Sequence, residues 1–144
     1  MNSWFITGVQ YNKTLENGRD KKVTELYLVD ALSFTEAEAR IIEEIKPFIS
    51  GEFNIVSIKR EKISEVIFND SADSWFKVKF NLITLDEKSG QEKKTSYYAL
   101  CQADDVKDAN SIFDGKMKGT MADYEVESIS ETKIVDVFKY EESK

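Results

Sequence analysis

The chain has 144 residues, of which 41% are hydrophobic and 33% are charged, a composition typical of a soluble globular protein. No segment approaches the roughly 18 apolar residues that span a bilayer, and the first residues lack the basic and apolar segments of a secretory signal. The net charge of −7 argues against a protein that coats DNA. We expect one compact cytoplasmic domain over residues 1–144, and the single Cys101, which cannot form an internal disulfide, agrees with a reducing compartment.

An internal repeat organises the sequence. Residues about 1–71 and about 72–144 carry similar residues in the same order, at an offset of 71 or 72 positions. Repetition of this kind is the signature of a duplicated structural unit. We therefore predict two copies of one ββαβ unit in tandem. The matched pairs include Trp4 with Trp75, Phe5 with Phe76, Leu28 with Leu100, Ala31 with Ala103, Ala37 with Ala109, Ile55 with Val126, Ile58 with Ile129, and Lys62 with Lys133.

Each copy begins with two predicted strands around a tight turn. The turns contain Gly18 and Gly90, and glycine favours hairpins because it adopts positive φ without steric cost. We expect one hairpin in each copy. The strands are predicted at residues 4–14 and 22–31 in the first copy and at residues 75–86 and 93–102 in the second.

A helix is predicted after each hairpin. Ser33 with Glu36 forms a capping box, and Asp105 with Asp108 is its weaker counterpart. Apolar residues then recur at helical spacing, which predicts one buried stripe on each helix. The stripes are Phe34, Ala37, Ile41 and Ile45 in the first helix and Val106, Ala109, Phe113 and Met117 in the second.

A long extended run closes each copy, at residues 53–68 and 124–140. Polar residues at positions 59–62 and 130–133 interrupt the apolar pattern of these runs. We expect a bend, a bulge or a split into two strands at each interruption.

These elements predict an α+β fold in two layers, with two helices on a mostly antiparallel sheet and the copies related by a pseudo-twofold axis. In the second copy, alternation places one set of side chains toward the helix and another on the outer face of the sheet. The helix-facing set is Phe76, Val78, Phe80 and Leu82. The outer set is Trp75, Lys77 and Lys79, with Trp4 on the equivalent face of the first copy, and the neighbouring strands are expected to add Tyr27, Val29, Tyr97 and Cys101 to a second face if the pairing register allows it.

The outer face is expected to be aromatic, whereas the far face of a helix-covered sheet is usually polar. Three interpretations stay open, because exposed apolar patches generally have a purpose. The outer faces of the two copies share one core, or they form a dimer interface, or they bind a ligand or partner.

Catalytic, cofactor-binding and metal-binding residues are not predicted. The chain has no histidine, which removes the commonest general base and most zinc sites, and it has no phosphate-binding glycine motif. Cys101 is expected to behave as a small hydrophobic residue. Glu65 and Asp136 occupy equivalent places and would make a symmetric Mg²⁺ pair, but repetition explains them equally well.

Basic residues give candidate contacts with a partner or ligand. The lysine pairs follow each hairpin turn, a further basic group lies at the first interruption, and Tyr11, Tyr97 and Tyr98 would be able to stack on bases. The alternative is a solvated hairpin end whose lysines discourage sheet aggregation. The candidate contact residues are Trp4, Trp75, Lys21, Lys22, Lys93, Lys94, Lys59, Arg60 and Lys62.

Trp4-Phe5, the run at residues 27–39 and the run at residues 116–121 together resemble a family of domains of unknown function from gut anaerobic bacteria, their phages and mobile elements. The resemblance covers essentially the whole chain. It implies a small intracellular protein encoded by a phage or prophage, and it carries no catalytic residue over to this sequence.

We expect a small non-enzymatic binding or interaction protein that serves a phage or mobile element as an accessory. Its partner would be a protein, or a second copy bound through the aromatic sheet face, and the acidity would suit a basic partner surface. One alternative is a single-stranded nucleic-acid-binding protein, which the acidic charge disfavours. A second alternative is a divalent-metal-dependent enzyme that uses carboxylates from both repeats.

Overall fold

The computed structural model describes residues 3–140 and has an α+β fold, as predicted. These residues form two helices and eight strands, arranged in two mostly antiparallel sheets. The described chain divides into two compact units: unit 1 contains residues 3–61 and 133–140, and unit 2 contains residues 62–132. That the chain is one domain stays a prediction. No helix among the described residues is long and apolar enough to cross a membrane.

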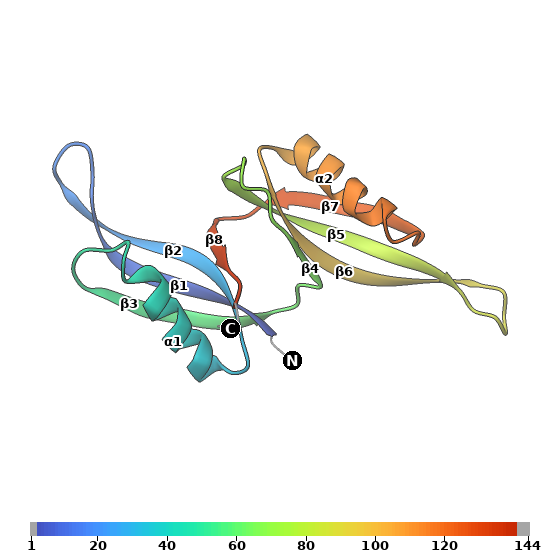
Figure 1. Ribbon diagram of the computed structural model, residues 1–144, viewed down its shortest axis with the longest axis horizontal. Helices are drawn as coiled ribbons and strands as arrows, with labels where there is room; N and C mark the ends of the chain where they lie inside the picture. Colours follow the sequence, from blue (N-terminus) through green and yellow to red (C-terminus); the bar gives the residue numbers. More distant parts are fainter. Residues whose placement is uncertain (1–2, 141–144) are drawn as a thin grey trace. The chain divides into compact units, whose positions relative to one another are not determined.

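Unit 1 contains one helix on a sheet of four strands in the order β3-β1-β2-β8. Figure 1 shows α1 lying across one face of this sheet. β8 comes from the end of the described chain and pairs parallel with β2, whereas the other pairs are antiparallel. The elements are β1 (Ser3–Thr14), β2 (Asp20–Ala31), α1 (Phe34–Ile45), β3 (Phe53–Glu61) and β8 (Ile134–Phe138).

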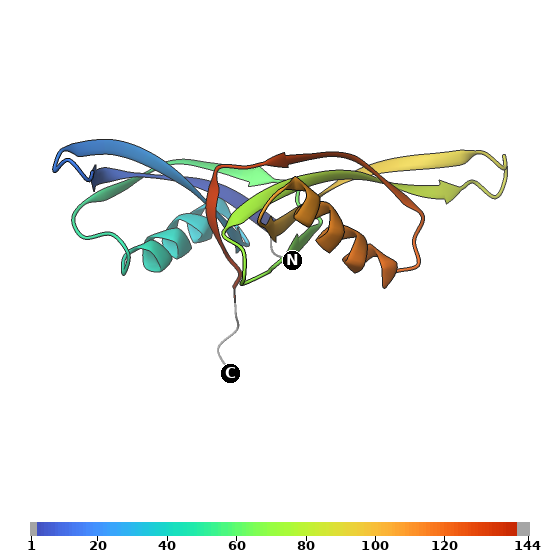
Figure 2. The same ribbon diagram turned by 90° about the horizontal axis from the view of Figure 1, so that it is seen from above.

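Unit 2 contains the second helix on a sheet in the order β4-β6-β5-β7. Figure 2 shows α2 on one face of β5 and β7. The short β4 pairs parallel with β6, and β5 pairs antiparallel with β6 and β7. The elements are β4 (Glu65–Ile67), β5 (Ser74–Leu85), β6 (Glu92–Ala103), α2 (Val106–Lys118) and β7 (Tyr124–Glu131).

The predicted hairpins and helix starts are confirmed. The turn glycines have positive φ, +82° at Gly18 and +70° at Gly90, a conformation that other residues rarely adopt. At the start of α1 the amide of Glu36 donates to Ser33 Oγ at 3.1 Å. At the start of α2 the amide of Asp108 donates to the carboxylate of Asp105 at 2.7 Å.

The predicted interruptions of the two long runs are splits into separate strands. The first run ends as β3 at Glu61 and resumes as β4 at Glu65, and the second ends as β7 at Glu131 and resumes as β8 at Ile134. In each case the second piece joins a different sheet from the first. Each of β3 and β7 also contains a bulge, at Val56 and at Glu127, where the register with β1 or β5 shifts.

Each unit has its own apolar core between its helix and its sheet. As predicted, the helix stripes are buried from the second position onward, and the alternating residues of β5 face α2. The core of unit 1 includes Phe5, Val9, Tyr27, Val29, Ala37, Ile41 and Ile45. The core of unit 2 includes Phe76, Val78, Phe80, Ala99, Cys101, Ala109, Phe113 and Met117.

The prediction that Tyr27, Val29, Tyr97 and Cys101 lie on the far face of the sheets is wrong. Residues directly opposite each other in an antiparallel pair share a face. Val29 pairs with Phe5, and Cys101 pairs with Phe76, so they face the helices and belong to the cores. Tyr97 pairs with Phe80 and stacks on its ring, which also places it on the helix side.

Candidate functional site

The two tryptophans lie on the sheet faces opposite the helices, as predicted, but they differ in exposure. Trp4 on β1 is half-buried, whereas Trp75 on β5 is only 1% exposed. The ring of Phe68 packs edge-on against Trp75, with centroids 5.5 Å apart. The indole N–H of Trp75 is buried and has no acceptor among residues 3–140.

The lysine pairs lie at the outer ends of the two hairpins. Lys21 and Lys22 are exposed at the start of β2, and Lys21 lies opposite Lys13. Lys93 and Lys94 are exposed near the start of β6. Lys94 Nζ lies 3.0 Å from Glu125 Oε1, a contact that raises the pKa of Lys94 and lowers that of Glu125.

The basic group at the first interruption is divided between the units. Lys59 is exposed on β3 of unit 1. The Arg60 guanidinium lies over the ring of Phe5, 5.2 Å from its centroid. Lys62 is exposed in unit 2, in the turn before β4. The nine predicted contact residues are therefore distributed over both units and over different ends of each sheet.

A groove of about 360 Å³ opens in unit 2 between α2 and the sheet. Phe80 lines the groove together with two other aromatic residues, and its ring centroid lies 4.8 Å from that of Phe113 on α2 and 5.9 Å from that of Tyr97 on β6. Two of the residues that line the groove form an ion pair, with Lys116 Nζ 3.5 Å from Glu65 Oε1. The other lining residues are Ser64, Leu82, Met117, Thr120 and Ala122.

A second, more open hollow of about 480 Å³ lies beside the groove. Ser64 and Tyr97 line both. Its other residues come from the turn before β4 and from the neighbouring part of β6, so the two hollows meet at one side of β6. These residues are Lys62, Ile63, Ser96 and Tyr98.

This side of β6 is paired along only part of its length. β4 covers residues 99–101, and the amide of Ser64 adds one bond, donating to the carbonyl of Tyr98 at 2.8 Å. No described strand pairs with β6 on this side before Tyr98. Backbone groups of alternate residues point the same way along a strand, so those of Lys94 and Ser96 also point to the open side.

Unit 1 has a tyrosine at the position that corresponds to Ala99 of unit 2. Tyr27 lies opposite Thr7, and Ala99 lies opposite Val78 at the same step of the unit 2 hairpin. The Tyr27 ring is 6% exposed and stacks on Phe138 of β8, with centroids 5.8 Å apart. Ala99 carries no ring and is fully buried, and the groove is lined by its neighbours Phe80 and Tyr97.

The unit 1 tyrosines share one carboxylate. The hydroxyls of Tyr11 and Tyr27 both donate to Glu25 Oε1, at 2.8 and 3.1 Å. Burial, together with the bond to Glu25, raises the pKa of Tyr11 to about 12. Burial and the charge of Glu25 also raise the pKa of Tyr27. These phenols are donors that fix the packing of unit 1.

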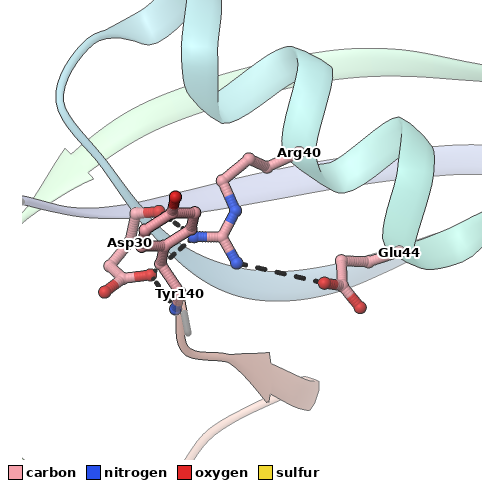
Figure 3. A network of polar contacts seen from close by, with 4 residues as sticks. All are labelled: Asp30, Arg40, Glu44 and Tyr140. Atoms are coloured by element: carbon pink, nitrogen blue, oxygen red, sulfur yellow. Dashed lines mark hydrogen bonds and ion pairs between the residues drawn. The ribbon is translucent and has the colours of Figure 1, made fainter. Parts of the chain in front are cut away.

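A polar network in unit 1 holds the segment that follows β8 (Figure 3). Arg40 Nη1 donates to the carbonyl and to Oδ1 of Asp30, at 2.7 and 2.8 Å. The Tyr140 amide donates to the same Oδ1 at 2.5 Å, and the Arg40 guanidinium lies 4.9 Å from the Tyr140 ring centroid. Glu44 Oε1 lies 3.9 Å from Arg40 Nη2. The Asp30 and Arg40 side chains are only 10% and 12% exposed, so the network is structural.

Unit 2 has a neutral counterpart of this network. Gln102 Oε1 accepts from the amide of Asn69, and Gln102 Nε2 donates to the carbonyl of Ala72, both at 2.9 Å. Asn69 follows β4 as Tyr140 follows β8. In each unit one side chain near the end of the central strand therefore fixes the segment after the added parallel strand.

The described residues contain no group of three or more histidine, cysteine or acidic side chains that could hold a metal ion. Glu65 belongs to unit 2 and pairs with Lys116, whereas Asp136 belongs to unit 1 and accepts from the amide of Val137. Cys101 is fully buried, and burial raises its thiol pKa to about 12, so the neutral thiol predominates at neutral pH.

Sequence reasoning missed the groove, because none of its residues is unusual by itself. The available signal was a difference between the two matched parts of the sequence: Tyr97, which lines the groove, stands where the first part has Glu25.

A family model described as a domain of unknown function, DUF4494, matches residues 3–140, and the chain belongs to this family. No curated protein matches the chain, and no solved structure matches it.

Proposed function

We propose that this protein is a non-enzymatic binding protein whose site is the groove of unit 2. The observation that carries the proposal is the groove itself, about 360 Å³ of open space over the rings of Phe80, Tyr97 and Phe113. Ligand sites are typically concave and mostly apolar, with a few polar groups that fix orientation. The Glu65–Lys116 pair and the Thr120 hydroxyl provide such groups at the rim.

Comparison with unit 1 supports this proposal. Tyr27 of unit 1 is buried in the core of that unit, whereas Tyr97 of unit 2 is 37% exposed and lines the groove. Exposed apolar surface carries a cost in water, which makes an unfilled groove between otherwise packed elements a candidate binding surface.

The test is dye binding with a matched pair of variants. Anilinonaphthalene sulfonate combines apolar rings with a negative charge that suits Lys116, and its fluorescence rises in apolar sites. Ala122→Trp places a bulky ring at the exposed edge of the groove, and Ala39→Trp makes the same change on the exposed side of α1.

We expect the native protein and Ala39→Trp to bind the dye with equal affinity and Ala122→Trp to raise its dissociation constant at least about tenfold, the equivalent of about 1.4 kcal/mol. Equal affinity of all three proteins for the dye, or no binding by the native protein, would reject the groove as a ligand site.

The proposal also covers the kind of partner and the cellular context of the protein. We propose that the partner is a protein and that this protein is a cytoplasmic accessory of a phage or mobile element. The support is the resemblance carried by Trp4-Phe5 and residues 27–39, together with a buried Cys101 that has no second cysteine to pair with.

We also infer that the chain arose by tandem duplication and that the copies exchange their last strands. The matched residues support this inference, as do the same order of corresponding strands in the two sheets and the bulges at Val56 and Glu127. The corresponding bonds to the amides of Asn69 and Tyr140 add support, since each follows an exchanged strand.

A further inference from the structure

We propose that the ligand is an extended segment of a partner protein, which adds as a strand to the open side of β6 and places alternate side chains in the two hollows. This inference rests on the proposed function, because it names the kind of ligand that the groove takes. Strand addition obtains affinity from main-chain hydrogen bonds and specificity from pockets for alternate side chains.

The backbone groups that such a strand needs lie on β6. The bond from the Ser64 amide to the Tyr98 carbonyl identifies the side toward which Tyr98 points. Ser96 and Lys94 follow at two-residue steps, so their amides and carbonyls point the same way, where no described strand covers them. An added strand would extend the row of bonds that β4 begins.

The hollows lie on the two faces of the sheet beside this row. The groove is on the helix side, where Tyr97 stacks on Phe80. The second hollow is lined by Ser96 and Tyr98, whose side chains point to the other face because neighbouring residues of a strand alternate. Successive side chains of an added strand alternate in the same way, so a single extended segment would fill both hollows.

The lining predicts the chemistry of the segment. The side chain that enters the groove meets Phe80, Phe113 and Met117, which favours an aliphatic or aromatic residue. The side chain on the other face meets the serine hydroxyls and the exposed ammonium of Lys62, which favours a polar or acidic residue. The segment should lack proline at the positions that pair with Ser96, because proline has no amide to donate.

The probe is a displayed library of random peptides about ten residues long, selected on the full chain and counter-selected on Ala122→Trp. We expect the recovered peptides to alternate apolar with polar or acidic residues and to lack central prolines. Recovery of peptides with helical spacing of apolar residues, or of none above background, would overturn the inference.

A selected peptide then gives a test that does not depend on altering the protein. Two versions are made, with backbone N-methyl groups on odd or on even residues. Only one set of amides faces β6 in an added strand, so one version should lose at least about tenfold in affinity while the other keeps its affinity. Equal affinity of both versions and the parent peptide would overturn strand addition.

Ser96→Pro removes the outward amide of β6, and Thr24→Pro makes the equivalent change on β2 of unit 1. We expect Ser96→Pro to abolish peptide binding and Thr24→Pro to keep it. The dye test separates the two proposals: dye binding that Ala122→Trp abolishes, combined with peptides insensitive to N-methylation, retains the groove and rejects the strand.

Discussion

The two units share one arrangement of a helix and four strands but differ in how side chains pack beside the hairpin. Unit 1 closes the space beside its hairpin with Tyr27, whose ring packs on Phe138 and whose hydroxyl is held by Glu25. Unit 2 has Ala99 at the corresponding place and leaves a groove over Phe80. The two units therefore differ in the side chains that pack beside the same pair of strands.

The units also differ in how they hold the segment after the parallel strand. Unit 1 uses a charged network of Asp30 and Arg40, whereas unit 2 uses the neutral amide of Gln102. Asp30 accepts a hydrogen bond from the backbone amide of Tyr140, and Gln102 accepts one from the backbone amide of Asn69. The backbone bond is therefore common to both units, and the charge is peculiar to unit 1.

The largest expected effect comes from opening unit 1. Tyr27→Ala removes a ring that is 6% exposed and should lower the free energy of unfolding by about 4 kcal/mol, since it leaves a cavity. Tyr97→Ala in unit 2 removes a ring that is 37% exposed and should cost about 1 kcal/mol. Urea unfolding followed by tryptophan fluorescence measures both, and equal losses would contradict the contrast between filled and open space.

The next effect separates the two networks. Arg40→Ala leaves the largely buried Asp30 carboxylate without its guanidinium partner and should cost about 3 kcal/mol. Gln102→Ala breaks neutral bonds and should cost about 1.5 kcal/mol. Urea unfolding measures the loss of unfolding free energy for both variants. A larger loss for Gln102→Ala than for Arg40→Ala would contradict the prediction.

A smaller effect is expected at alkaline pH. Folding raises the pKa of Tyr11 and Tyr27, so the folded state favours the neutral phenols, and their contribution to stability is complete below about pH 10 and is lost as the pH rises further. The double variant Tyr11→Phe, Tyr27→Phe should therefore lose less unfolding free energy than the native protein between about pH 10 and pH 12. Urea midpoints across this range measure the slopes, and identical slopes would rule out this linkage.

Local patterns predicted the elements of the fold but not the partners of its shortest strands. The alternation of β5, the turns at Gly18 and Gly90 and the helix stripes depend on neighbouring residues, and they are confirmed. The face of Val29 and of Cys101 depends on the pairing register, which alternation in one strand does not fix. β4 and β8 join sheets through pairs distant in the sequence, and no local pattern encodes such a choice.

The candidate site was less predictable than the fold, because its lining residues come from several elements that are distant in the sequence. The lysines and tryptophans were predicted as contact residues because of their residue types, but the structure distributes them over both units. The groove brings together residues of β4, β5, β6 and α2, and β4 pairs only with residues 99–101 of β6, two features that become visible only when the strands are paired.

The most direct test of the account is the NMR spectrum of the full chain, labelled with ¹⁵N and titrated with anilinonaphthalene sulfonate. We predict that amide shifts concentrate at Ser96–Tyr98 and Phe113–Met117 in unit 2, while Thr24–Leu26 in unit 1 stay unchanged. Shifts at residues 24–26, or shifts confined to the exposed lysine pairs, would contradict the claim that unit 2 carries the binding site.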